Sequence, residues 1–211
     1  MYRKFTPLLA VLCLLFAVSC TQTQYVAAPS APTAQEDFDS GMRAFNQEQY
    51  QAALSSFEQA VMKSPGFVDA QFYAGLSAWK LNMIERAKQS FLDALRLDAN
   101  HVKTREALGI LYYSTGEFDR SRQQLEAARS LNSVNPEVYL DLGRIYVMEG
   151  RCPEALQVFE KGLQVDSSYL PLKNEYDAAR HKCGKGGPAK PPVIHEKTFR
   201  GGGKAIDPSD F

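Results

Sequence analysis

The sequence has little that would support catalysis, metal binding or nucleic-acid binding. Its three histidines, His101, His181 and His195, are far apart and show no metal-ligand spacing. It contains neither a nucleophile elbow nor a glycine-rich phosphate loop. Its 24 basic residues balance 24 acidic ones, so the overall charge gives no argument for nucleic acid as a partner. We therefore expect a protein that is not an enzyme and that has no metal site and no cofactor.

The chain also has no apolar run long enough to span a membrane comfortably. The uncharged run near its start, PLLAVLCLLFAVS at residues 7–19, has about thirteen residues, whereas a membrane-spanning helix needs about twenty. Arg3 and Lys4 precede this run. A short cationic start followed by such a run is typical of a secretory signal peptide.

The run ends in FAVSC, and the small residues before Cys20 resemble the bacterial lipobox, in which the cysteine is acylated and becomes the first residue of the mature chain. The match departs at Ala17, where the family most often has leucine. Cys13 is no competitor, because it follows a leucine that is too large for the cleavage pocket. The resemblance implies a signal peptide at 1–19 and a lipid anchor at Cys20, and two or more acyl chains anchor stably. An ordinary cleaved signal and an uncleaved anchor are the alternatives.

Residues 20–34 begin with that cysteine and continue as an Ala-, Pro-, Ser- and Thr-containing linker without periodicity, which we expect to be flexible. Fully extended, residues 21–34 reach at most ~45–50 Å. Thr21, and not an aspartate, follows the cysteine. By analogy with the sorting rule for such lipoproteins, this favours a lipid-anchored protein of the bacterial cell envelope, at the outer membrane and facing the periplasm.

From residue 35 onwards, a 34-residue period organises the chain. Four columns of small, small, large and small residues keep this register: Gly41, Gly75, Gly109 and Gly143; Ala53, Ala87, Ser121 and Ala155; Phe57, Phe91, Leu125 and Phe159; Ala60, Ala94, Ala128 and Gly162. The columns resemble the tetratricopeptide repeat, in which small residues let two antiparallel helices approach closely. We therefore predict an all-α solenoid of four helix-turn-helix repeats across 35–168. The repeats fall at 34–67, 68–101, 102–135 and 136–169.

Each repeat should contain two helices, and a further helix should cap the array. The first helices are expected at 35–47, 68–81, 102–115 and 136–149, and the second helices at 50–63, 84–97, 118–131 and 152–165. Residues 169–183 are helical in pattern but have Asp177 at the glycine position, which is typical of a solvating cap. The composition of the remainder, 184–211, which is rich in Gly, Pro and Lys, predicts a disordered tail. The alternative is that its apolar stretch VIHEKTF is a short docking segment.

Two cysteines remain once Cys13 is removed with the signal and Cys20 is lipidated. An even remainder in an exported chain suggests a disulfide. In a tetratricopeptide array, Cys152 would begin the second helix of the fourth repeat and Cys183 would end the cap helix. Both would therefore lie at the same end of the stack. We predict that they are bonded to each other; two unrelated free thiols are the alternative.

The first helices of a tetratricopeptide array turn one set of positions toward a concave groove. The expected partner-binding residues are Phe38, Met42, Phe45, Phe72, Leu76, Trp79, Ile110, Tyr113, Leu140, Arg144, Val147 and Met148. A long apolar stripe usually marks an interaction surface, and we expect an extended peptide or an amphipathic helix as the ligand. Lys80 and Arg144 would pair with its acidic residues. Alternatively, superhelical curvature or the chain's own tail buries much of the stripe.

The combination of lipobox, linker and repeats resembles two kinds of envelope lipoprotein. One is the pilotin type, which escorts secretin subunits during pilus assembly, and the other is the adaptor type, which gathers murein hydrolases. The clamp that chaperone-binding members use for a C-terminal carboxylate is absent, because Phe38 and Met42 stand at the matching positions. We expect a membrane-tethered scaffold for partner proteins. An accessory protein that binds cell-wall material and a homo-oligomeric structural lipoprotein are the alternatives.

Overall fold

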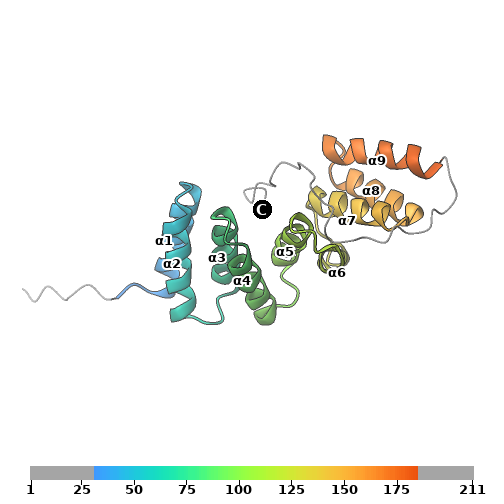
Figure 1. Cartoon of the computed structure of the whole chain (residues 1–211). Helices are drawn as coiled ribbons and strands as arrows, with labels where there is room; N and C mark the ends of the chain where they lie inside the picture. Colours follow the sequence, from blue (N-terminus) through green and yellow to red (C-terminus); the bar gives the residue numbers. More distant parts are fainter. Residues whose placement is uncertain (1–30, 185–211) are drawn as a thin grey trace, which may run out of the picture. The chain divides into compact units, whose positions relative to one another are not determined.

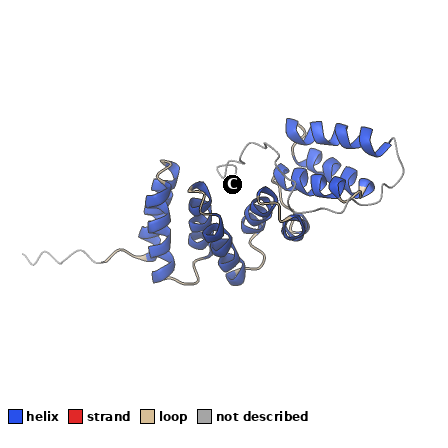
Figure 2. Cartoon of the chain, in the orientation of Figure 1, coloured by secondary structure: helices blue, strands red, loops and turns tan. Residues whose placement is uncertain are grey.

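The computed structural model describes residues 31–184, and in this range the chain forms α-helices and no strand (Figure 1, Figure 2). The expected signal peptide, Cys20, most of the expected linker and the tail at 185–211 lie outside the described residues. None of the described helices is long and apolar enough to cross a membrane.

The helices occur in the order and at the places that the repeat pattern predicts. They are α1 (Ala34–Asn46), α2 (Tyr50–Lys63), α3 (Val68–Lys80), α4 (Ile84–Leu97), α5 (Val102–Ser114), α6 (Phe118–Ser130), α7 (Pro136–Met148), α8 (Cys152–Val165) and α9 (Leu170–Gly184). The bounds of the first eight agree with the expected ones to within one residue, and α9 stands where the cap was expected. The prediction of an all-α chain is confirmed for the described range.

A left-handed residue recurs in the turn inside each helix pair. Glu48, Asn82, Gly116 and Gly150 have φ angles of 60°, 58°, 79° and 74°, and they fall in one column of the 34-residue period. The next amide then donates to a carbonyl near the end of the preceding helix, as from Met83 N to the Ala78 carbonyl oxygen at 2.8 Å. Glycine adopts this backbone without strain, whereas a glutamate does so at a cost.

The repeated glycines let the two helices of a pair approach closely. A methyl group built on Gly75 would lie 2.6 Å from two ring carbons of Phe91, far inside van der Waals contact. The third pair has Ser121 in the small column, and its buried hydroxyl donates to the carbonyl oxygen of Gly109 at 2.8 Å. The glycine and Phe/Leu columns are therefore complementary in shape, as the sequence predicted.

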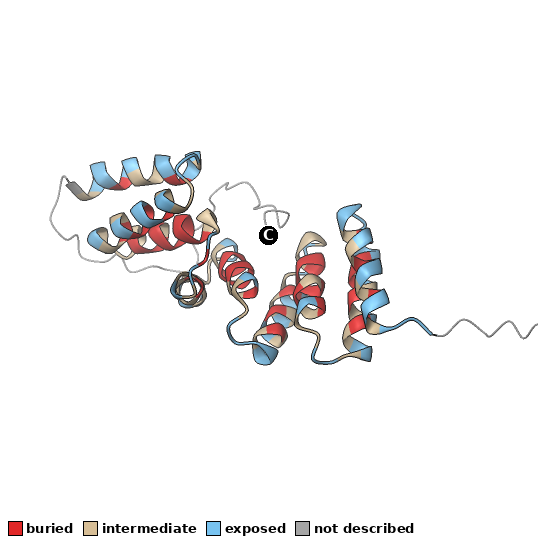
Figure 3. Cartoon of the chain, turned by 180° about the vertical axis from the view of Figure 1, so that it is seen from behind, coloured by how far each residue is buried: buried red, intermediate tan, exposed pale blue. Residues whose placement is uncertain are grey.

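Every described helix contains buried residues, which are red in Figure 3. They form two clusters that meet in α5, which places Leu108 and Leu111 in the first and Ile110 in the second. The half-buried Trp79 packs against both clusters. Consecutive helix pairs therefore share a continuous apolar interior.

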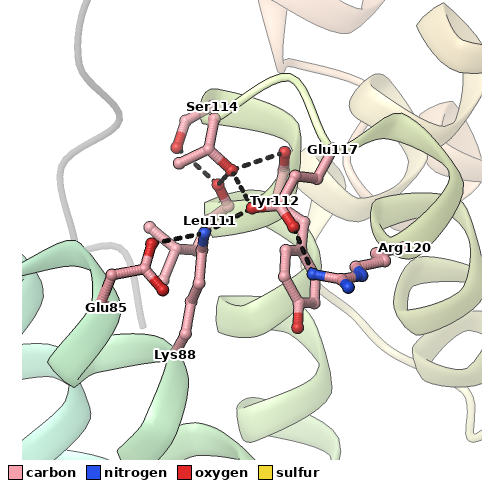
Figure 4. Close-up of polar contacts among 8 residues, drawn as sticks. Glu85, Lys88, Leu111, Tyr112, Ser114, Glu117 and Arg120 are labelled. Carbon is pink, nitrogen blue, oxygen red and sulfur yellow. Dashed lines mark hydrogen bonds and ion pairs between the residues drawn. The ribbon is translucent and has the colours of Figure 1, made fainter. Parts of the chain in front are cut away.

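Ion pairs join the middle helix pairs to one another. Lys88 on α4 bonds to Glu117 in the turn after α5 and to Glu85 at 3.0 Å, and Arg120 donates to Glu117 at 2.6 Å (Figure 4). One period later, Arg122 Nε lies 3.0 Å from Glu149 Oε1. This column reads Leu54, Lys88, Arg122 and Leu156, so a cation replaces leucine at two of its four positions. These ion pairs connect one helix pair to the next, and the exposed ones contribute little stability individually.

The last helix, α9, packs on α7 and α8. Its Leu172 and Ala179 are buried in the second cluster, and Gly162 leaves room for Leu172 because a methyl group there would lie 2.6 Å from it. Cys152 and Cys183, the pair that the sequence predicted, are bonded in the structure, with a Cα–Cα distance of 5.6 Å. This bond attaches the end of α9 to the start of α8.

Candidate functional site

Two hollows lined by described residues contain none of the predicted partner-binding residues. One, of about 500 Å³, lies between α6 and α8 and is lined mainly by polar side chains, among them Arg129, Gln157 and Lys161. The other, of about 470 Å³, lies beside the turn after α5 and is lined by Phe118, Ile145 and five residues of mostly charged character. The described residues also hold no cluster of potential metal ligands.

Four of the predicted partner-binding residues belong to the core and not to an accessible surface. Phe72, Leu76, Ile110 and Leu140 are each at most 1% exposed. The Phe72 ring, for example, lies 6.0 Å from the Phe91 ring and 5.4 Å from the His101 ring at the start of α5. Neighbouring helices cover these positions in the two buried clusters, which corrects the expectation that they line an open groove.

The other eight predicted residues are half-buried, and with Tyr73 they form what we call the first-helix face. Its members are Phe38, Met42, Phe45, Tyr73, Trp79, Tyr113, Arg144, Val147 and Met148. In its N-terminal part, the Phe38 and Phe45 rings each lie 5.8 Å from the Tyr73 ring, edge to face. Such contacts stabilise aromatic pairs beyond their buried area, so this part of the face is fixed in place.

Lys80 and Arg144, the two cations expected to meet acidic groups of a ligand, have partners within the chain. Lys80 Nζ lies 5.5 Å from the centre of the Tyr50 ring. Arg144 on α7 donates to Glu175 Oε1 on α9 through Nε at 3.1 Å and Nη2 at 3.0 Å. A ligand carboxylate at Arg144 would therefore compete with Glu175.

Asp141 lies beside Arg144 and is fully buried. Its Oδ1 accepts one long bond from Arg144 Nη1 at 3.4 Å, and its Oδ2 has no hydrogen-bond partner. We call this group the acidic junction, because it joins three helices and contains more carboxylates than cations: Tyr113 on α5, Glu137, Asp141 and Arg144 on α7, and Glu175 on α9.

Burial raises the pKa of the Asp141 carboxyl well above its usual value of 3.8; the negative charge of Glu137 adds to the rise, and Arg144 opposes it. Burial also raises the pKa of Tyr113 to about 12, with a contribution from the charge of Asp141. A buried carboxyl without a full set of partners is costly to fold when ionised. The acidic junction therefore reduces the stability of the free protein near neutral pH.

The substitution Asp141→Asn is expected to stabilise the protein at neutral pH. Because the folded-state pKa lies above the unfolded one, the stability that Asp141 contributes is fully present below about pH 4 and is lost as the pH rises through the folded pKa. The asparagine variant should not show this loss. Its gain should be about 1.4 kcal/mol for each tenfold change in the acid dissociation constant on folding.

Urea unfolding of both chains between pH 3.5 and pH 8 would measure this effect. The two unfolding free energies should converge at acid pH and separate as the pH rises. Asp119→Asn is the matched control, because that carboxylate is 93% exposed. An Asp141→Asn variant that is less stable than the parent at pH 7 would show that the ionised carboxylate is well compensated.

Asp141 and Glu175 were missed by the sequence analysis. Asp141 stands two residues before Gly143, in a column that reads Asp39, Tyr73, Ala107 and Asp141. This column was not among the positions from which the groove residues were predicted, and including it would have brought out both Tyr73 and Asp141. Nothing in the sequence signals the pairing of Glu175, because α9 lies beyond the last matching repeat.

Comparison with known proteins supports the repeat assignment. The tetratricopeptide-repeat family model matches residues 38–102 and 106–169. No protein of curated function matches the sequence. Solved structures of MamA are among those similar to this chain, and three of them are described next.

The first is described as the crystal structure of MamA protein, with a TM-score of 0.64 and 18% identity over 72% of this chain and 82% of that one. The second, MamA AMB-1, has a TM-score of 0.61 and 22% identity over 72% and 82%. The third, MamA from Desulfovibrio magneticus RS-1, has a TM-score of 0.65 and 15% identity over 72% of this chain and 86% of that one. At these identities the likeness shows the fold alone. The segments that the family model matches make up more than half of the chain, and the chain therefore belongs to the tetratricopeptide-repeat family.

Proposed function

We propose that this protein is a membrane-tethered scaffold that binds partner proteins through its first-helix face. Tetratricopeptide arrays present extended surfaces suited to protein binding. The observation that carries the proposal is the composition of the face, where half-buried aromatic, methionine and arginine side chains are held on packed helices. These residue types are enriched at the cores of protein interfaces.

The proposed tether is a lipid on Cys20, and the proposed place of action is the outer membrane, on the periplasmic side. The lipobox-like FAVSC and the linker after it support this part of the proposal. Assembly of an envelope complex of the pilus and secretin kind fits such a tethered scaffold, and gathering of cell-wall hydrolases is the second candidate. Self-association through the face is the third.

Metabolic labelling with palmitate tests the tether. The parent chain expressed in a Gram-negative cell should be labelled and should sediment with membranes. Cys20→Ser should abolish the label, whereas Cys13→Ser should leave it unchanged because Cys13 lies within the proposed signal peptide. Equal labelling of the Cys20→Ser chain would refute lipidation at that residue.

Cross-linking in intact envelopes tests the binding face. A Trp79→Ala/Tyr113→Ala chain should lose at least tenfold of its cross-linked partner. The matched control is Met62→Ala/Val134→Ala, because these side chains are 74% and 78% exposed and lie outside the face. Both variants must first show the helical content of the parent and remain folded at the temperature of the experiment, because Trp79 packs against both buried clusters. Equal partner yield from the two variants would contradict the proposal. A dimer of the soluble domain at micromolar concentration would favour self-association.

A further inference from the structure

We propose that the acidic junction binds the basic segment 185–204 of this same chain, so that the C-terminal tail occupies part of the first-helix face. The binding itself does not depend on the proposed function. The consequence that the tail competes with partner proteins rests on it.

The acidic junction has unused capacity for a positive charge. Asp141 and Glu175 share the guanidinium of Arg144, which makes two good bonds to Glu175 and one long bond to Asp141. Asp141 Oδ2 is buried without a hydrogen-bond donor. The side chains of Arg144 and Glu175 are 31% and 39% exposed. A second cation could therefore reach Glu175 from solvent and leave more of Arg144 for Asp141.

The segment that follows α9 has the complementary chemistry. Residues 185–204 carry five cations and one carboxylate: Lys185, Lys190, Lys197, Arg200, Lys204 and Glu196. Val193, Ile194 and Phe199 are interspersed among the charges. A basic segment with interspersed apolar residues suits a face that combines carboxylates with aromatic rings, because both charge pairing and apolar burial are satisfied.

The segment also begins within reach of the junction. It follows Gly184, and Glu175 stands nine residues earlier on α9, which corresponds to about 14 Å along the helix. Twenty extended residues span at most ~66–72 Å. Attachment to the same chain gives such a segment an effective concentration on the order of millimolar, so the bound state predominates when the dissociation constant of the segment is below about 1 mM.

A labelled peptide tests the proposal. The probe is a synthetic peptide of residues 185–204, and its fluorescence anisotropy is followed against two chains at about 50 mM salt, where charge pairing is little screened. One chain ends at Gly184 and keeps every described helix and the disulfide; the other is full length. The peptide should bind the shortened chain at least tenfold more tightly, because the full-length chain already carries the segment. Equal affinity for the two chains, or no binding to the shortened one, would overturn the proposal.

Variants separate the acidic junction from charge in general. In the shortened chain, Asp141→Asn/Glu175→Gln should weaken peptide binding at least fivefold. Glu85→Gln/Asp119→Asn removes two carboxylates that are 86% and 93% exposed and lie outside the junction, and should leave it unchanged. In the full-length chain, Lys197→Glu/Arg200→Glu should restore binding of the parent peptide.

Other occupants would give different results. If the segment of a second copy fills the junction, the full-length chain should sediment as a dimer and the shortened one as a monomer, which would overturn binding within one chain. A peptide that does not bind would refute the tail proposal alone, because the cross-linking experiment with the Trp79→Ala/Tyr113→Ala chain does not depend on the tail. The two proposals therefore fail separately.

Discussion

Replacing Phe91 with alanine is expected to lower the free energy of unfolding by about 3–5 kcal/mol. The Phe91 ring is fully buried on α4 and fills the space that Gly75 leaves on α3. It also lies 6.0 Å from the Phe72 ring and 6.4 Å from the Trp79 ring. Gly75 has no side chain with which to fill the cavity. Urea denaturation followed by circular dichroism would measure the loss.

Leu92→Ala is the matched control for this experiment. Leu92 follows Phe91 on the same helix but is 39% exposed, and its truncation should cost about 1 kcal/mol or less. Comparable losses from the two variants would mean that the column of large residues is not the main source of pair stability. The comparison should use both the urea concentration at the unfolding midpoint and the dependence of the unfolding free energy on urea concentration, because repeat arrays can unfold in more than one step.

Removing the disulfide is expected to cost about 3–4 kcal/mol. The bonded residues are 31 apart in sequence, and in the chain-entropy model a loop of this length gives a stabilisation of that size. A Cys152→Ser/Cys183→Ser chain should therefore unfold earlier. The effect should be strongest at α9, which otherwise depends on the burial of Leu172 and Ala179 and on the Arg144–Glu175 pair.

Reductant provides the internal control for the disulfide. It should bring the parent chain to the stability of the double serine variant and should not change the variant itself. Protease cleavage within α9 should increase in both cases. If the parent and variant unfold at the same urea concentration without reductant, the bond contributes nothing measurable to the fold.

Most of the fold could be predicted from the sequence, because its determinants are local and periodic. Glycine at Gly75 and a large residue at Phe91 constrain the same contact, and the constraint recurs in every pair. The turns are equally local, although the column that contains Glu48 and Asn82 is visible only once the left-handed angles are known. Neither residue is a glycine, which is the usual sequence signal for a left-handed turn.

The binding face was harder to predict, because exposure depends on what the next helix pair covers. Leu76 and Trp79 are one turn apart on α3, yet Leu76 is 1% exposed whereas Trp79 is half-buried. Hydrophobicity alone does not separate them. Asp141 was equally hidden, since Tyr113 and Glu175, with which it interacts, come from two other helices.

The disulfide gives the two ends of the array different mechanical properties. The bond between Cys152 and Cys183 holds the α8–α9 end covalently, whereas α1 and α2 at the other end are held to α3 by noncovalent packing. If Cys20 carries a lipid, a force between the membrane and a bound partner enters the array at α1. That force cannot extend the segment between Cys152 and Cys183 while the disulfide is intact, because the bond closes this segment into a loop.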